Sequence, residues 1–197
     1  MNDLDKVILT DCDGVLLNWE YAFHVWMDTH GYKRQLGAQL QYDVGHQYGI
    51  ERAVSKNCVR TFNESAAIGF LPPLRDAIKY VRKLHEEHGY VFHCITSLSE
   101  DPHAYKLRMM NLEKLFGEGV FEKLICLDCG ADKDGVLAKY KDTGAYWIED
   151  KPENADAGTK AGFDSILIEH RHNLGYTGEA KIAPLWADVY NIITNNL

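Results

Sequence analysis

The chain lacks the features that mark several large classes of protein. It has no run of about 18 apolar residues, so a membrane-spanning helix is not expected. Its first residues, MNDLDKVILTD, contain no basic segment followed by an apolar stretch, so no secretory signal is expected. Its five cysteines are an odd number, which argues against a complete disulfide framework and for a reducing, cytoplasmic location. Cys126 and Cys129 have no two further ligands at zinc-site spacing and are interpreted as ordinary strand-end cysteines.

An excess of positive charge is also missing. The 197 residues carry a formal net charge of −8 at pH 7. Proteins that bind nucleic-acid polymers present basic patches to the phosphate backbone, so this balance argues against such a partner. A small phosphorylated substrate remains compatible with it, because a metal ion and one or two local cations can reverse the potential inside a single cleft.

A regular alternation of strand and helix patterns fills the chain from about residue 70 onward. Together with a first apolar run at 6–11, apolar runs at 90–96, 121–127, 145–148 and 165–168 predict buried strands. Helical patterns lie between and after them, one opening at Pro72 and ending at Gly89, and others near 102–116, 133–141, 152–162 and 185–193. This order predicts an α/β fold, with βαβ units in a Rossmann-like, doubly wound parallel sheet.

Residues 18–69 interrupt this alternation. The segment has no convincing strand pattern and is rich in aromatic and polar residues. We therefore predict a helical cap over residues 18–69, inserted into a core domain of residues 1–17 and 70–197. Its aromatic residues are candidates to stack on a planar group of a substrate, although helical spacing of this kind is more often typical of a cap core. These candidates are Trp19, Phe23, Trp26, Tyr42, Phe62 and Phe70.

The most informative stretch is Asp11-Cys12-Asp13-Gly14, which follows the apolar run 7–9 after one residue, Thr10. Open α/β sheets bind their ligands at the carboxyl ends of the strands. Two carboxylates at that point repel each other unless a divalent cation offsets their charge. The pattern therefore predicts a nucleophilic aspartate beside a second acid, with Mg²⁺ bound to them. A calcium loop fits less well, because its acids come in another order and end in a late glutamate.

Three further groups follow later predicted strands. Thr96 and Ser97 end the second strand, where a hydroxyl and backbone N–H groups could hold a phosphate oxygen, although such a pair is also a common helix cap or turn. Lys133 follows the third strand and could neutralise a phosphate, although alone it is typical of a solvated turn. Glu149 and Asp150 end the fourth and could complete an oxygen-ligand site for a hard cation, although an acidic pair at a strand-to-helix turn is equally typical of helix capping. Each of these groups follows a predicted strand. Together they indicate a site for phosphate and a metal ion far more specifically than any one of them does alone.

With these motifs the chain resembles the haloacid dehalogenase-like hydrolases. DCDGV (11–15) is similar to their first motif and ITS (95–97) to their second, while Lys133 looks like the third and IEDKPENADAGTKAG (148–162) like the fourth. Within this superfamily the chain is most similar to the 5′(3′)-deoxyribonucleotidases, in its DxDGVL start, small cap and acidic pair. It departs from the usual pattern at Cys12, where a bulkier apolar residue is common, and at Asn154, where an aspartate is common.

The resemblance implies a hydrolase, namely a Mg²⁺-dependent phosphatase that cleaves a phosphomonoester of a small metabolite. A (deoxy)nucleoside monophosphate is the leading candidate substrate, which would make the enzyme a 5′-nucleotidase. By resemblance, Asp11 attacks phosphorus, and Asp13 protonates the leaving oxygen and then activates the hydrolytic water. The resemblance also implies phosphate binding by Thr96, Ser97 and Lys133, and metal binding by Asp11, the backbone carbonyl of Asp13, and Asp150, with Glu149 acting through a water.

Two other functions stay open at this point. One is a polynucleotide 3′-phosphatase of the same superfamily, which the acidic charge and the sizeable cap disfavour because a long polymer needs an open basic groove. The other is a binding module that keeps the fold without catalysis, which the intact motifs disfavour. The cluster His170-Arg171-His172 follows the last predicted strand, and it either reaches a substrate or forms a solvated loop. The substrate and the oligomeric state are not determined, although the cap could support a homodimer.

Overall fold

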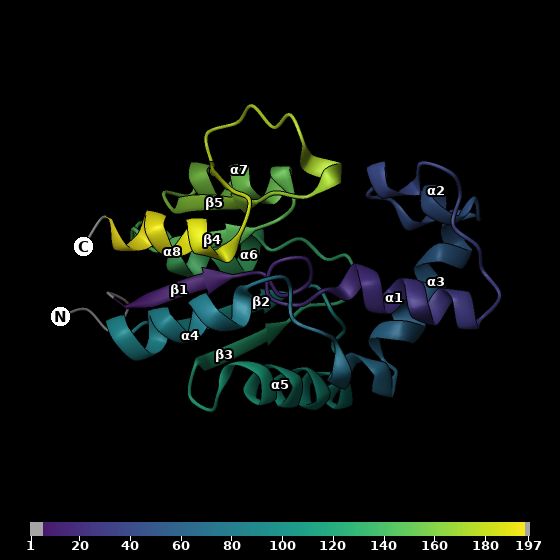
Figure 1. Ribbon diagram of the computed structural model, residues 1–197, viewed down its shortest axis with the longest axis horizontal. Coiled ribbons are helices and arrows are strands. Elements are labelled where there is room, and N and C mark those ends of the chain that lie inside the picture. The colour runs from purple at the N-terminus through teal and green to yellow at the C-terminus, as the bar shows by residue number, and fades with distance from the viewer. Residues whose placement is uncertain (1–5, 196–197) are drawn as a thin grey trace.

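The computed structural model describes residues 6–195. Its centre is a six-stranded sheet with the strand order β3-β2-β1-β4-β5-β6 (Figure 1). All neighbouring strands pair in parallel, so the predicted Rossmann-like, doubly wound sheet is confirmed. The strands are β1 (Val7–Thr10), β2 (Val91–Thr96), β3 (Phe121–Cys126), β4 (Tyr146–Glu149), β5 (Asp164–Ile168) and β6 (Lys181–Ala183).

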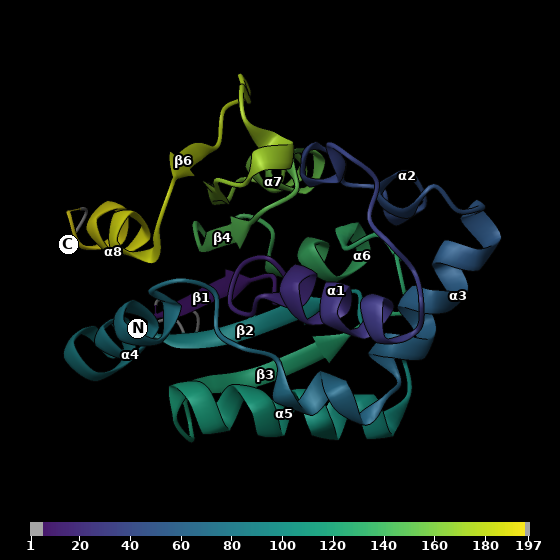
Figure 2. The same ribbon diagram turned by 45° about the vertical axis from the view of Figure 1, so that its right-hand side comes forward.

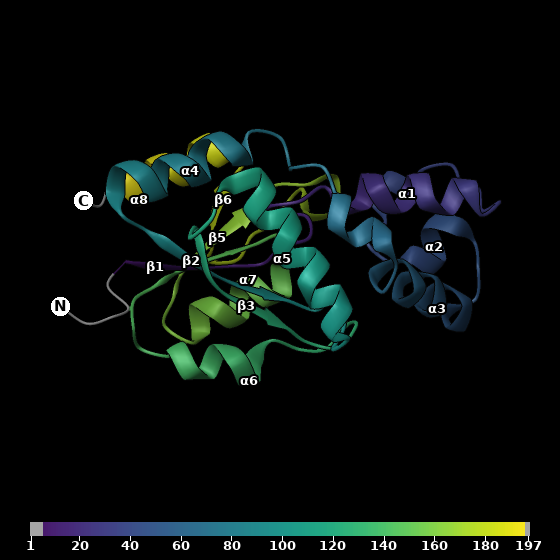
Figure 3. The same ribbon diagram turned by 90° about the horizontal axis from the view of Figure 1, so that it is seen from below.

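Helices cover both faces of this sheet (Figure 3). Side chains alternate between the two faces along a strand. In β1, Ile8 packs in the cluster that contains residues of α4 (Ala77–His88), α5 (Pro102–Phe116) and α8 (Trp186–Thr194). Its neighbour Leu9 packs on the other face with Trp147 and Leu137, where α6 (Asp134–Leu137) lies. α7 (Pro152–Lys160) lies against β4 and β5. Every helix within residues 6–195 is too short or too polar to span a lipid bilayer.

The chain reverses its direction of strand addition beside β1. It builds β1, β2 and β3 outward on one side and then crosses back to place β4 on the other side of β1. The carboxyl ends of β1 and β4 therefore lie next to each other at a topological switch point, where open α/β sheets bind ligands. This order brings the ends of the first and fourth predicted strands, which carry the aspartate pair and the Glu149-Asp150 pair, to one edge of the sheet.

A helical group stands beyond the carboxyl ends of the strands (Figures 1 and 2). It consists of α1 (Trp19–Thr29), the 3₁₀ turn η1 (Ala38–Leu40), α2 (Val44–Tyr48) and α3 (Arg52–Asn63). Trp19 stacks on Phe23 with 4.5 Å between ring centroids, and Phe23 and Phe62 are fully buried. The aromatic stripe of α1 is therefore the core of this group.

The proposed division into cap and core stays a prediction. The predicted core domain extends over residues 1–5 and 196–197, which lie outside the described part of the chain. Near the other boundary, the 3₁₀ turn η2 (Ala66–Phe70) packs on α5 of the core. The N–H of Leu71 there donates to the Asn111 side chain at 2.8 Å.

Three elements differ from the sequence-based expectation. α4 begins at Ala77 rather than at Pro72, because residues 72–74 run beside residues 16–18 through backbone hydrogen bonds and a bridge between Leu17 and Pro73. The helix expected over 133–141 consists of α6 and a 3₁₀ turn, η3 (Ala138–Tyr140). β6 was not predicted because its three residues are too few for a hydrophobic pattern.

Candidate active site

Asp11 leaves the end of β1 with both carboxylate oxygens held. Its own N–H donates to the carbonyl of Ile148 in β4 at 2.9 Å, which fixes the backbone at the switch point. Oδ1 accepts a hydrogen bond from the N–H of Cys12 at 2.7 Å, and Oδ2 lies 2.8 Å from Nζ of Lys133. The residue between the two aspartates thus serves Asp11 through its backbone, so the unusual Cys12 leaves this contact intact.

Lys133 is a buried cation beside Asp11. It precedes α6, and its Nζ lies 3.4 Å from both carboxylate oxygens of Glu149 in addition to its contact with Asp11. Burial alone would lower the pKa of Lys133, but the negative charges of Asp11 and Glu149 outweigh burial and raise that pKa above its ordinary value. The predicted cation is therefore present, charged and in contact with the predicted nucleophile.

Three carboxylates gather around one point. Asp11, Glu149 and Asp150 each offer an oxygen within 4.8 Å of the others. Burial and the charge of Asp11 raise the pKa of Asp150 to about 8, and the same causes raise the pKa of Glu149 well above its ordinary value. Such a concentration of buried negative charge is stabilised by a divalent cation, and carboxylate oxygens are the ligands that Mg²⁺ prefers. The donor set therefore fits the predicted ion.

Asn154 and Gly14 complete this cluster. Nδ2 of Asn154 donates to Oε1 of Glu149 at 2.7 Å, so the departure from the usual fourth motif supplies a contact that orients Glu149. Gly14 has a φ of 80°, and a Cβ at this position would collide with the carboxylate of Asp150. The turn after Asp13 can therefore lie against Asp150 only because residue 14 is glycine.

Asp13 has a partner that the sequence analysis did not identify. Its carboxylate accepts two hydrogen bonds from Arg108, at 2.5 Å from Nη1 and 3.2 Å from Nη2. Burial raises the pKa of Asp13, and the charge of Arg108 opposes this shift without cancelling it. Arg108 lies in α5, 95 residues away, in an ordinary helical pattern, so no local signal in the sequence marked it.

Thr96 and Ser97 lie at the end of β2, as predicted. Thr96 is 1 % exposed. The hydroxyl of Ser97 donates to the carbonyl of Ala131 at 2.8 Å, which ties the end of β2 to the loop just before Lys133. Because the hydroxyl proton of Ser97 is used in this hydrogen bond, Ser97 would donate to a phosphate oxygen through its backbone N–H.

The loop after β5 forms one wall of the site. It contains the 3₁₀ turn η4 (Arg171–Asn173). Nε2 of His170 lies 2.6 Å from the carbonyl of Gly14, and Nδ2 of Asn173 donates to the carbonyl of Asp150 at 2.8 Å. The ring of His172 also approaches Asp150, with Nε2 3.7 Å from Oδ2. His170 and His172 are therefore packed against the site, whereas Arg171 between them is exposed, and Asn173 is a site residue that the sequence analysis missed.

Tyr42 connects the helical group to this wall. Its ring lies 5.2 Å from that of His172, centroid to centroid, and Nζ of Lys151 lies 5.8 Å from its centroid. The side chain remains 58 % exposed. Of the aromatic candidates, Trp19, Phe23 and Phe62 pack together in the helical group, whereas Tyr42 stands at the edge of the carboxylate cluster.

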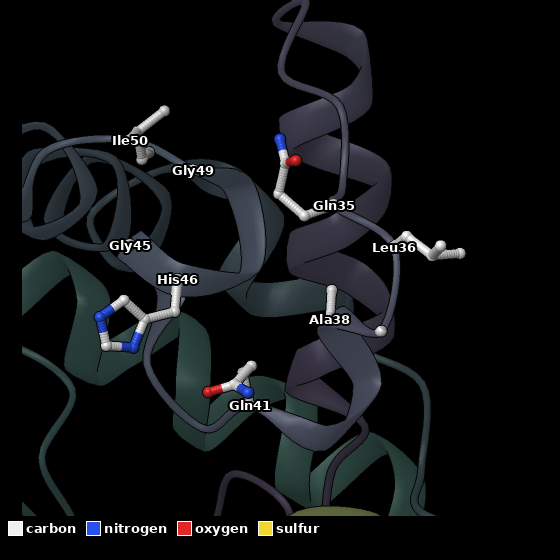
Figure 4. A pocket seen from close by; sticks show the side chains of 9 residues that line it. Gln35, Leu36, Ala38, Gln41, Gly45, His46, Gly49 and Ile50 are labelled. Atoms are coloured by element: carbon white, nitrogen blue, oxygen red, sulfur yellow. The ribbon is translucent and has the colours of Figure 1, made fainter.

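A separate cavity of about 460 Å³ lies within the helical group (Figure 4). None of its lining residues belongs to the predicted site, although Gln41 directly precedes Tyr42. The cavity is lined by Gln35, Leu36, Gly37, Ala38, Gln41, Gly45, His46, Gly49 and Ile50.

Comparison with known sequences identifies one distant relative. No family model matches the chain. An uncharacterized 32.4 kDa protein of Enterobacteria phage T4, from the Gp30-rIII intergenic region, is 25 % identical over 159 residues. The match covers 78 % of this chain and 56 % of the phage protein, so the chain spans little more than half the length of the curated relative that it matches.

Solved structures share the fold over nearly the whole chain. A haloacid dehalogenase-like hydrolase from Streptococcus pneumoniae matches with a TM-score of 0.65 at 15 % identity, covering 95 % of this chain and 98 % of that one. The D,D-heptose 1,7-bisphosphate phosphatase of B. bronchiseptica, in complex with magnesium and phosphate, matches with a TM-score of 0.59 at 11 % identity, covering 98 % and 99 %. The chain therefore has the haloacid dehalogenase-like fold, as its motifs predicted.

Proposed function

We propose that the chain is a Mg²⁺-dependent phosphomonoesterase of the haloacid dehalogenase-like superfamily. Its substrate is a small phosphorylated metabolite, with a (deoxy)nucleoside monophosphate as the leading candidate. The observation that carries the proposal is the contact of 2.8 Å between Lys133 and Asp11 inside a cluster of buried carboxylates. The phosphatase of the same fold that binds magnesium and phosphate supports this reading of the cluster.

The first chemical step is attack on phosphorus by Asp11. A carboxylate attacks an anionic phosphate only where positive charge offsets the repulsion. Lys133 provides one such charge. Asp11, the backbone carbonyl of Asp13, and Asp150 would hold Mg²⁺, which supplies Lewis-acid neutralisation of the phosphate. As the bond from Asp11 to phosphorus forms, the bond from phosphorus to the leaving oxygen breaks, and an aspartyl-phosphate results.

Asp13 moves the protons of both half-reactions. An alkoxide leaves readily only if it gains a proton, and the raised pKa of Asp13 favours its carrying one. Asp13 then takes a proton from the water that attacks the aspartyl-phosphate, which releases phosphate and restores Asp11. A halide leaves without protonation, so the presence of this second acid favours phosphate chemistry over dehalogenation.

The loop after β5, which forms one wall of the site, lies beside Tyr42 of the helical group. This arrangement favours a substrate that contains a planar group. Tyr42 presents an exposed ring beside His172, at the edge of the carboxylate cluster. Aromatic rings of this kind stack on bases. The net charge of −8 and the helical group beyond the strand ends disfavour a polynucleotide substrate. The homodimer and the cytoplasmic location stay predictions.

The proposal is tested by phosphate release from a panel of phosphate esters. The panel holds 5′- and 3′-nucleoside monophosphates, sugar phosphates and a 3′-phosphorylated oligonucleotide, each with Mg²⁺ and with a chelator. We expect release that depends on Mg²⁺ and falls by at least about 10³-fold in Asp11→Asn. Asp132→Asn, an exposed acid beside Lys133, is the matched control and keeps full activity. Unchanged activity of Asp11→Asn would contradict the mechanism, and a preference for the oligonucleotide would contradict the substrate class.

A further inference from the structure

Arg108 is a buried arginine with an unusual set of partners. Its side chain is 0 % exposed, and both Nη atoms donate to the two oxygens of Asp13. Nη1 also lies 2.8 Å from Sγ of Cys12. Buried polar atoms usually all have hydrogen-bond partners, but Nε of Arg108 has none. The paired contact with Asp13 is therefore the main interaction that holds this guanidinium in place.

Two buried cations divide the acids of the site between them. Lys133 contacts Asp11 and Glu149, whereas Arg108 contacts Asp13. Among residues 6–195, these are the two lysine or arginine side chains that are buried. The side chain of Asp13 is not among the three carboxylates that can share a metal ion. The division places the nucleophile with one cation and the proton-transfer acid with the other.

The two contacts to Asp13 fix the plane of its carboxyl group. A single donor lets a carboxylate rotate about the contact, whereas a guanidinium bound to both oxygens fixes both its position and its plane. Arg108 has no exposed surface, so it does not contact a substrate itself. The Asp13 side chain keeps 23 % of its surface exposed, which leaves it open toward a bound ester.

We propose that Arg108 is a positioning residue, which holds the carboxyl group of Asp13 in the orientation from which it exchanges a proton with the leaving oxygen. This inference rests on the proposed phosphatase function. It predicts that loss of Arg108 slows formation of the aspartyl-phosphate only where the leaving oxygen needs a proton. An alkoxide needs one, whereas p-nitrophenolate leaves as a stable anion.

The test compares the two kinds of leaving group in Arg108→Met and Arg108→Lys. The quantity measured is kcat/KM, which covers the steps up to formation of the aspartyl-phosphate. For Arg108→Met we expect a fall of about 10²-fold with the best alkyl phosphate of the panel and of less than about threefold with p-nitrophenyl phosphate. Arg108→Lys keeps the charge without the paired geometry and is expected to lie between wild type and Arg108→Met. The control Lys114→Met, an exposed cation of the same helix, changes neither value. Equal losses with both substrates would overturn the proposal.

Two further measurements keep the inference testable if Arg108→Met folds poorly or if the wild type has another activity. Asp13→Asn/Arg108→Met removes both charges together, and it should match Asp13→Asn in kcat/KM; an additional loss would show that Arg108 acts elsewhere. A crystal structure of Arg108→Met or Arg108→Lys should show the Asp13 carboxyl group rotated from its present orientation. An unchanged orientation would overturn the positioning role, whereas a wild type that hydrolyses no phosphate ester would contradict only the proposed function.

Discussion

The cluster of buried acids makes the stability of the metal-free protein depend on pH in a predictable direction. Asp150 has an ordinary pKa of 3.8 and a pKa of about 8 in the folded chain. Between these values the unfolded chain loses this proton while the folded chain keeps it. The contribution of Asp150 to stability is therefore fully present below about pH 4 and is lost as pH rises through about 8.

The magnitude follows from the same two pKa values. One pKa unit corresponds to about 1.4 kcal/mol. Between pH 6 and pH 8, Asp150 should thus lower the free energy of unfolding by about 2 kcal/mol. For a chain of 197 residues this corresponds to a fall in melting temperature of about 4–8 °C.

The assay is thermal unfolding of the chelated protein at several pH values, for wild type and Asp150→Asn. An asparagine at position 150 does not ionise. Between pH 6 and pH 8, the free energy of unfolding of Asp150→Asn should therefore fall by about 2 kcal/mol less than that of the wild type. Glu153→Gln, an exposed acid in the first turn of α7, is the matched control and should follow the wild type. Identical slopes for wild type and Asp150→Asn would refute the reasoning.

Added Mg²⁺ provides an independent check of the same linkage. The ion must displace the Asp150 proton, so its affinity should be about 50-fold weaker at pH 6 than at pH 8. The rise in melting temperature caused by a fixed Mg²⁺ concentration should therefore be larger at pH 8. A larger rise at pH 6, or an undiminished rise in Asp150→Asn, would show that the ion does not bind at this cluster.

Three other substitutions test separate parts of the site. Lys133→Met should lower kcat/KM by about 10²–10³-fold in steady-state kinetics, because the buried charge beside Asp11 is lost; a loss below about tenfold would argue against its role. Gly14→Ala should lower the free energy of unfolding in urea by about 1–3 kcal/mol and weaken Mg²⁺ binding, because its Cβ meets Asp150; unaltered Mg²⁺ affinity would contradict this. Asp13→Asn should cost about 3 kcal/mol in urea unfolding, because it leaves Arg108 buried and uncompensated, and Asp13→Asn/Arg108→Met should recover most of that loss.

Much of the framework follows from local patterns in the chain. The apolar runs predicted as strands at 6–11, 90–96 and 145–148 correspond to the buried strands β1, β2 and β4 of the structure. Because alternating strands and helices form parallel sheets, all such strands point the same way and end at one edge. Chain order therefore predicts that residues after the strands meet at this edge, and Asp11 and Lys133 lie 2.8 Å apart there, whereas the roles predicted for them stay predictions.

Contacts that join distant segments could not be predicted in this way. Arg108 meets Asp13 across 95 residues, and His170 meets Gly14 across 156. Arg108 and His170 lie in segments whose local sequence pattern is equally typical of a solvated surface. Their burial depends on how α5 and the loop after β5 pack against the sheet, which is decided by the summed packing of many side chains.

The amino-acid sequence alone thus specifies five of the six strands, their parallel arrangement and the edge at which the acids and the lysine appear, because these depend on hydrophobic periodicity and chain order. The partner of each acid depends on three-dimensional packing. Lys133 and Arg108 are both basic residues in polar or helical segments, and nothing local distinguishes which acid each will meet. Folding assigns Lys133 to Asp11 and Arg108 to Asp13, since a buried charge is stable only beside an opposite charge that the fold brings within hydrogen-bonding distance.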